Sequence, residues 1–140
     1  MSEPSSLFIS AHELISSQYQ PSWLIKNYLE EQSISLLYGS SGGGKSFLAL
    51  DWACCVATGK AWHNHKIKQG KVLYIAGEGR SGLAGRLKAW QIHHQMAVPA
   101  ENLIISKSSF NIDTAEDVLK ITEALPNTHF SLVIIDSLNR

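Results

Sequence analysis

The sequence has little cysteine, no long hydrophobic run and no excess of charge of either sign. Its two cysteines, Cys54 and Cys55, are adjacent, so they suit neither a disulfide framework nor the spacing of a zinc site. No apolar run approaches the roughly 18 residues of a membrane-spanning helix. Lysine and arginine together number 12, as do aspartate and glutamate. The chain therefore lacks the strongly basic surface typical of a free-standing nucleic-acid-binding protein.

Targeting signals and repeats are also missing. The first residues contain no basic stretch followed by an apolar one, so no secretory signal is predicted and we expect a cytoplasmic protein. The 140 residues allow one domain, and 44% hydrophobic and 17% charged residues are ordinary for a globular chain.

Short apolar runs alternate with stretches of helical periodicity after residue 32. Such alternation indicates βαβ units, and so an α/β fold with a mostly parallel sheet flanked by helices. We expect residues 1–32 to be a polar lead-in, with one or two short helices packing on the edge of the core, and residues 33–140 to form the main domain. The expected strands are 34–38, 72–76, 103–106 and 132–136, and the expected helices are 45–58, 81–96 and one that begins near 114 and ends before Pro126.

A glycine-rich motif lies between the first expected strand and the first expected helix of the domain. Residues 39–46 read Gly-Ser-Ser-Gly-Gly-Gly-Lys-Ser, which matches the phosphate-binding P-loop in full. Glycines let backbone amides curl around phosphate oxygens, and the helix that follows points its positive end at the same place. Lys45 is expected to reach the β- and γ-phosphates of ATP, and Ser46 to bind Mg²⁺. The positions expected to contact the nucleotide are Gly39, Ser40, Ser41, Gly42, Gly43, Gly44, Lys45, Ser46 and Phe47.

An apolar strand ending in a carboxylate supplies a second element of such a site. Residues 132–136 read Leu-Val-Ile-Ile-Asp, the pattern of a Walker B strand, in which Asp136 would hold Mg²⁺ directly or through water. The alternative is a structural role, because buried strands often end in aspartate at a turn. The P-loop earlier in the chain favours the metal role.

The catalytic base is not adjacent to Asp136. Many P-loop ATPases have a glutamate directly after the Walker B aspartate, but here that residue is Ser137. Glu78 follows the expected strand 72–76 between two glycines, at the carboxyl end where ligands bind in open α/β sheets. We therefore expect Glu78 to polarise the water that attacks the γ-phosphate. A helix-capping or ion-paired glutamate is the alternative.

Three stretches together resemble a known ATPase family. They are Leu36–Ser46, Tyr74–Arg80 and Val133–Arg140, and they look like the RecA-like ATPases of the plasmid and phage RepA type, which are similar to hexameric replicative helicases. The resemblance covers about residues 20–140. It implies that Lys45 and Ser46 are the Walker A pair, that Asp136 is the Walker B acid and that Glu78 is the catalytic glutamate.

The resemblance also implies partners and further elements. Single-stranded DNA and a homo-oligomeric ring, a hexamer, would be expected of the full-length protein. In that family the strand between the P-loop and Walker B strands, the DNA-facing loops and the arginine finger come later than Arg140. From this we expect a fragment of a longer ATPase, which alone is marginally stable and hydrolyses ATP poorly.

Other functions stay open at this point. A RecA-like recombination or regulatory ATPase would have the same site without unwinding DNA. A truncated nucleotide-binding module would bind ATP with little hydrolysis. A small-molecule kinase fits less well, since neither an acceptor pocket nor an arginine-bearing lid is recognisable.

Overall fold

The computed structural model describes residues 7–77, 80–110, 112–125 and 127–136. After residue 44 helices and strands alternate, as the sequence predicts, and the α/β fold of a P-loop NTPase is confirmed. In chain order the elements are α1 (Ala11–Ser16), β1 (Trp23–Ile25), β2 (Leu29–Glu30), α2 (Lys45–Thr58), β3 (Val72–Ala76), α3 (Arg80–His94), β4 (Leu103–Ile105), α4 (Ala115–Ala124) and β5 (Leu132–Asp136).

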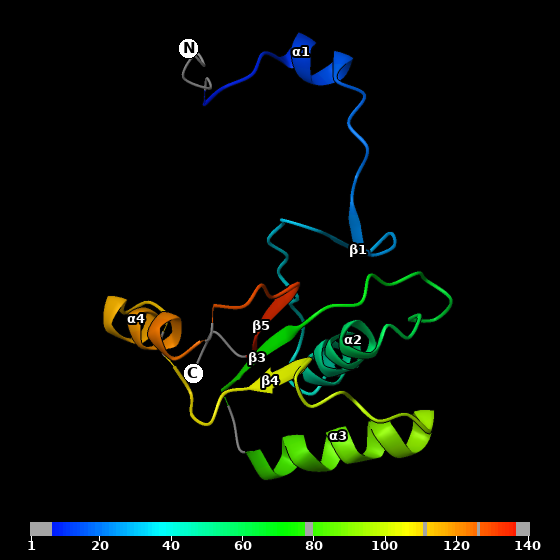
Figure 1. Ribbon diagram of the computed structural model, residues 1–140, viewed down its shortest axis with the longest axis vertical. Helices are drawn as coiled ribbons and strands as arrows, with labels where there is room; N and C mark the ends of the chain where they lie inside the picture. The colour runs from blue at the N-terminus through cyan, green and yellow to red at the C-terminus, as the bar shows by residue number, and fades with distance from the viewer. Residues whose placement is uncertain (1–6, 78–79, 111, 126, 137–140) are drawn as a thin grey trace.

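The main sheet has three parallel strands in the order β4-β3-β5. Val72 pairs with Leu103 on one side and with Leu132 on the other, and the ladder with β5 runs as far as Ala76 and Asp136. Parallel neighbours need crossover connections, and α3 and α4 supply them. Helix α2 packs against all three strands, while α4 lies on the side of the sheet away from α2 (Figure 1).

Helix α2 forms over the residues predicted for it. Gly59 ends it in a left-handed conformation, φ 77°, and donates its N–H to the carbonyl of Cys55 at 2.8 Å. Its second half provides the centre of the core, where Ala53, Cys54, Val56 and Ala57 are fully buried. Among the described helices, none combines the length and the apolar character needed to cross a bilayer.

The part of the lead-in that packs on the core is a β-hairpin rather than a helix. Asn27 turns the chain with φ 69°, and Ile25 forms a bridge with Ile67 of the connection between α2 and β3. Leu24, Ile25 and Leu29 are buried in the same core as α2. The expectation that the lead-in packs on the core through short helices was wrong, because a residue suited to a left-handed turn and a distant strand partner favour a hairpin here.

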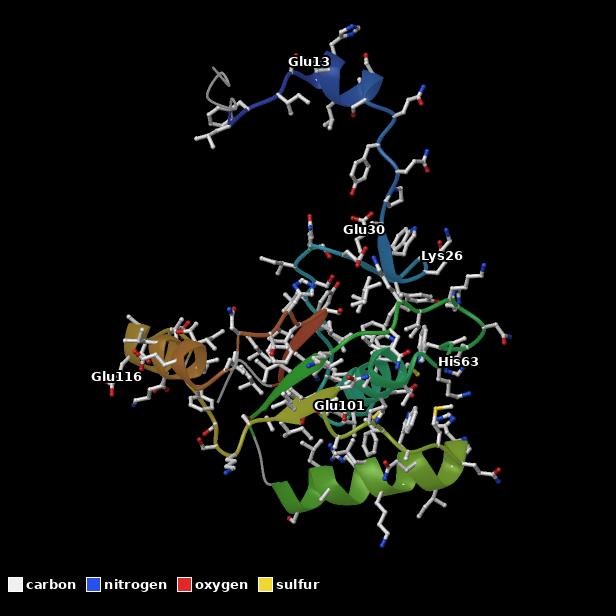
Figure 2. All side chains as sticks on the ribbon, viewed as in Figure 1. Glu13, Lys26, Glu30, His63, Glu101 and Glu116 are labelled. Carbon is white, nitrogen blue, oxygen red and sulfur yellow. The ribbon has the colours of Figure 1, made fainter. Side chains whose placement is uncertain are left out.

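Among residues 7–32 of the lead-in, α1 is the one helix, and it does not pack on the core. Ser10 and Glu13 form a reciprocal capping box, with Ser10 Oγ accepting from the Glu13 N–H at 3.1 Å. Every residue of α1 is exposed, and Figure 1 shows it standing away from the body. In Figure 2 Glu13 lies well apart from Lys26 and His63 of the body. The division of the chain at residue 33 stays a prediction.

Residues 34–38 do not form the buried strand that the sequence suggested. They have no ladder partner among the described residues, and Ile34 and Tyr38 expose 102% and 85% of their surface. A short apolar run indicates a strand only where a neighbour can satisfy its backbone groups. In the described part of the chain the neighbour of β5 is β3, and the other edge of β5 is not paired with residues 34–38.

Candidate nucleotide-binding site

The P-loop turns directly into helix α2. Gly42 and Gly44 have φ values of 75° and 88°, a left-handed conformation that glycine adopts at little cost. Gly43 allows a close approach, since a Cβ there would lie 3.0 Å from the Ser40 carbonyl oxygen, which accepts from the Gly43 N–H. The backbone conformation of the loop therefore requires glycine at these three positions.

The N-terminus of α2 is suited to an anion. Within the described residues no side chain caps it, and its first turn contains no acidic residue. The first amides of a helix need acceptors, and the helix dipole favours negative charge there. Residues 39–44 are all exposed, so a phosphate can reach these amides from solvent.

Lys45 lies against the backbone of the loop. Its Nζ donates to the carbonyl oxygens of Gly39 and Ser40, both at 2.8 Å. The ammonium is thus held at the loop that the motif assigns to phosphate. A phosphate group would compete with the two carbonyls, and it would win through its charge.

The structure brings Ser46 and Asp136 together from positions far apart in the chain. Ser46 is the second residue of α2, Asp136 is the last residue of β5, and Ser46 Oγ donates to Asp136 Oδ1 at 3.1 Å. Both side chains are half-buried. The carboxyl end of a parallel strand and the start of a helix therefore meet where α/β sheets bind their ligands.

A third residue of this cluster, Tyr74, was missed by the sequence analysis. Tyr74 lies on β3 with 1% of its surface exposed, and its hydroxyl donates to Asp136 Oδ2 at 2.5 Å. Burial raises the pKa of Tyr74 well above its usual range, and the hydrogen bond to Asp136 and the charge of that carboxylate raise it further. Tyr74 is therefore a protonated donor at neutral pH.

The donor set fits Mg²⁺. The ion prefers oxygen ligands, commonly one or two carboxylates or hydroxyls together with phosphate oxygens and water. Ser46 and Asp136 offer a hydroxyl and a carboxylate within hydrogen-bond distance of each other, next to the P-loop. These are the residues that would hold the ion, either directly or through its water.

Phe47 lies at the edge of this cluster. It exposes 60% of its surface, and the guanidinium of Arg86 on α3 lies 4.3 Å from the centre of its ring. This cation–π contact joins the first turn of α2 to α3. A contact between Phe47 and the nucleotide stays a prediction.

Two positions that mattered in the sequence analysis lie outside the described residues. Glu78, the expected catalytic glutamate, falls between Gly77 and Arg80, and Ser137 follows β5. The role of Glu78 therefore stays a prediction. The preceding strand β3 does end at the same sheet edge as β5, with Ala76 paired to Asp136.

Comparison with known proteins gives one match. No curated protein and no solved structure is similar enough to this chain to count as a match. A family model described as AAA domain matches residues 2–140, which is nearly the whole chain and includes every residue of the candidate site. The chain therefore belongs to the AAA domain family of P-loop ATPases.

Proposed function

We propose that this chain binds ATP with Mg²⁺ and hydrolyses it as a RecA-like motor domain, part of a ring-forming DNA helicase in plasmid or phage replication. The observation that carries the nucleotide site is the contact of Ser46 with Asp136 at 3.1 Å, across 90 positions of sequence. It lies at the first turn of the helix that follows the P-loop.

Each residue has a role in the proposed reaction. Lys45 and the loop amides bind the phosphates and orient the γ-phosphate for attack. Ser46 and Asp136 would hold Mg²⁺, which would supply positive charge to neutralise the charge that develops on the phosphate. Glu78 accepts the proton of the attacking water.

The helicase assignment is supported by the resemblance of three motifs to the RepA type. Their spacing, with Glu78 after the second strand and Ser137 after the Walker B acid, favours this branch over P-loop ATPases with an adjacent glutamate. Single-stranded DNA and neighbouring subunits of a hexameric ring are the proposed partners.

Hydrolysis and its response to DNA test this proposal. The rate of phosphate release by the full-length protein is measured with and without single-stranded DNA, for the wild type and for Glu78→Gln. We expect DNA to raise the wild-type rate, and Glu78→Gln to lower it by at least about 100-fold while nucleotide binding is kept. Hydrolysis retained in Glu78→Gln would exclude Glu78 as the base.

Two alternative functions predict other results. A RecA-like recombination or regulatory ATPase would hydrolyse ATP but would displace no strand from a forked duplex. A nucleotide-binding module would bind Mg·ATP with no turnover that responds to DNA. Strand displacement by the full-length protein separates the first alternative from the helicase.

A further inference from the structure

The two oxygens of the Asp136 carboxylate have different partners. Oδ1 accepts from Ser46 of α2, and Oδ2 accepts from the Tyr74 hydroxyl of β3. One oxygen thus faces the helix that follows the P-loop, and the other is tied to the neighbouring strand. A carboxylate fixed at one oxygen cannot rotate freely, so the second oxygen keeps its direction.

The register of the two strands explains why a tyrosine makes this contact. Tyr74 pairs with Ile134, while Asp136 pairs with Ala76, so the phenol spans two residues along the shared sheet face. Two residues of strand measure about 6.6 Å. Among the hydroxyl-bearing side chains only tyrosine is long enough to span that distance.

Core packing alone does not account for Tyr74. Its ring packs in the hydrophobic cluster between α2 and β3, a place that phenylalanine would fill equally well. The hydroxyl adds nothing to that packing, but it ends on the carboxylate at the carboxyl end of β5. The contact with Asp136 is therefore what a tyrosine provides at this position and a phenylalanine would not.

We propose that Tyr74 is a positioning residue for the magnesium site. Its hydroxyl holds the Asp136 carboxylate in the orientation that binds Mg²⁺ or its water. The proposal rests on the proposed nucleotide-binding function. Groups that hydrogen-bond to metal ligands orient them, and their removal typically weakens metal binding by about 10- to 100-fold.

Tyr74→Phe tests this, because it keeps the ring and removes only the hydroxyl. A fluorescent ADP analogue is bound to the protein, and Mg²⁺ is titrated from an EDTA-treated start. In Tyr74→Phe we expect the Mg²⁺ concentration at half-saturation to rise by about 10- to 100-fold. The affinity for the analogue in EDTA stays within about twofold of the wild type, because the phosphate contacts of the loop are unchanged.

Two controls separate positioning from folding. Tyr28→Phe makes the same change at a ring that packs on Trp52 and Trp62, and it should leave the Mg²⁺ midpoint unchanged. In an Asp136→Ala background, Tyr74→Phe should have no further effect, because Tyr74 acts through that carboxylate.

Three results would overturn the proposal. They are an unchanged Mg²⁺ midpoint in Tyr74→Phe, an equal loss of analogue affinity with and without Mg²⁺, and a full effect of Tyr74→Phe in the Asp136→Ala background. If the wild type itself binds no nucleotide, the proposed function fails first, and this proposal fails with it.

A second measurement leaves Tyr74 intact. The chain has four tyrosines, and a variant that combines Tyr19→Phe, Tyr28→Phe and Tyr38→Phe keeps Tyr74 as its one tyrosine. With ¹³C-labelled tyrosine, Mg²⁺ added to the ADP-bound protein should shift the Tyr74 ring resonance, and Asp136→Ala should abolish that shift. A resonance that does not respond to Mg²⁺ would refute the proposal.

Discussion

The two ends of helix α2 differ in almost every respect. At its C-terminal end the helix is enclosed by the β1–β2 hairpin, the connection to β3 and helix α3, and Val56 and Ala57 are fully buried. At its N-terminal end residues 39–44 of the P-loop are exposed, and the segment 34–38 that leads into the loop exposes its apolar side chains.

This difference separates stability from binding. The enclosed end buries apolar surface, which stabilises the fold. The exposed end keeps helix amides and a lysine available for an anion, which contributes little to stability until a ligand binds. Variants at the enclosed end should therefore change unfolding, whereas variants at the exposed end should change nucleotide binding.

The largest change in stability is expected at Asp51. Its carboxylate accepts hydrogen bonds from Trp62 Nε1 and Trp90 Nε1, both at 2.8 Å. These two bonds link helix α2 to helix α3 and to the segment between α2 and β3. Asp51→Ala leaves two indole N–H groups without this acceptor, and we expect the free energy of unfolding to fall by about 4 kcal/mol. Urea unfolding followed by tryptophan fluorescence measures it.

The control for Asp51 is an exposed carboxylate. Glu101→Ala removes the carboxylate of an exposed residue, and its effect should stay within about 0.5 kcal/mol. A loss under about 1 kcal/mol in Asp51→Ala would show that the two indole contacts do not hold the enclosed end together.

Two isoleucines compare the ends directly. Ile25 of the hairpin is 0% exposed and Ile34 of the segment before the P-loop is 102% exposed. Ile25→Ala should lower the free energy of unfolding by about 3 kcal/mol through lost burial and a cavity, and Ile34→Ala by less than about 0.5 kcal/mol. Chemical denaturation of both variants decides this. A loss of unfolding free energy in Ile34→Ala as large as that expected for Ile25→Ala would mean that residues 34–38 are buried in a strand after all.

The smallest expected effect concerns thiol reactivity. Burial raises the pKa of Cys54 and Cys55 to about 12, with neighbouring negative charge adding to it. Since the thiolate is the nucleophile, both should react with a disulfide reagent at pH 8 about 100-fold more slowly in the native chain than in the unfolded one. A cysteine placed at exposed position 35 by Ser35→Cys should react as fast as in the unfolded chain.

The same two thiols give a pH dependence. A raised pKa means that the folded state binds the proton more tightly than the unfolded state. The contribution of the two thiols to the free energy of unfolding is therefore complete at pH values below 9.0, the ordinary pKa of a cysteine. It is lost as the pH rises towards about 12. Native-state labelling as fast as that of unfolded protein would contradict the burial of these cysteines.

Motifs and periodicity predicted most of the elements. Residues 45–58, 72–76 and 132–136 form the helix and strands assigned to them, because glycine, a full P-loop match and continuous apolar runs mark them locally. The hairpin at residues 23–30 was not predicted and residues 34–38 were misassigned, since the structure of both segments depends on distant partners. Ile67 pairs with the first segment, and no described strand pairs with the second.

The candidate site was predictable where a motif names the residue. Motifs named Lys45, Ser46 and Asp136, and the structure brings Ser46 and Asp136 into contact and holds Lys45 at the loop; their roles stay predictions. Tyr74 was not found, because a tyrosine in an apolar strand looks like core. Its contact with Asp136 requires the register of two parallel strands, which sequence spacing does not give.

The binding of Mg·ATP to the intact chain tests the central claim most directly. Calorimetric titration of a slowly hydrolysed ATP analogue, with Mg²⁺ and in EDTA, is compared for the wild type, Lys45→Ala and Asp136→Ala. We expect saturable binding to the wild type that strengthens with Mg²⁺. Lys45→Ala should weaken it by at least about tenfold under both conditions, and Asp136→Ala should weaken it only with Mg²⁺. Wild-type protein that binds no analogue, or Lys45→Ala that binds it equally well, would contradict the assignment of this loop and carboxylate as a nucleotide site.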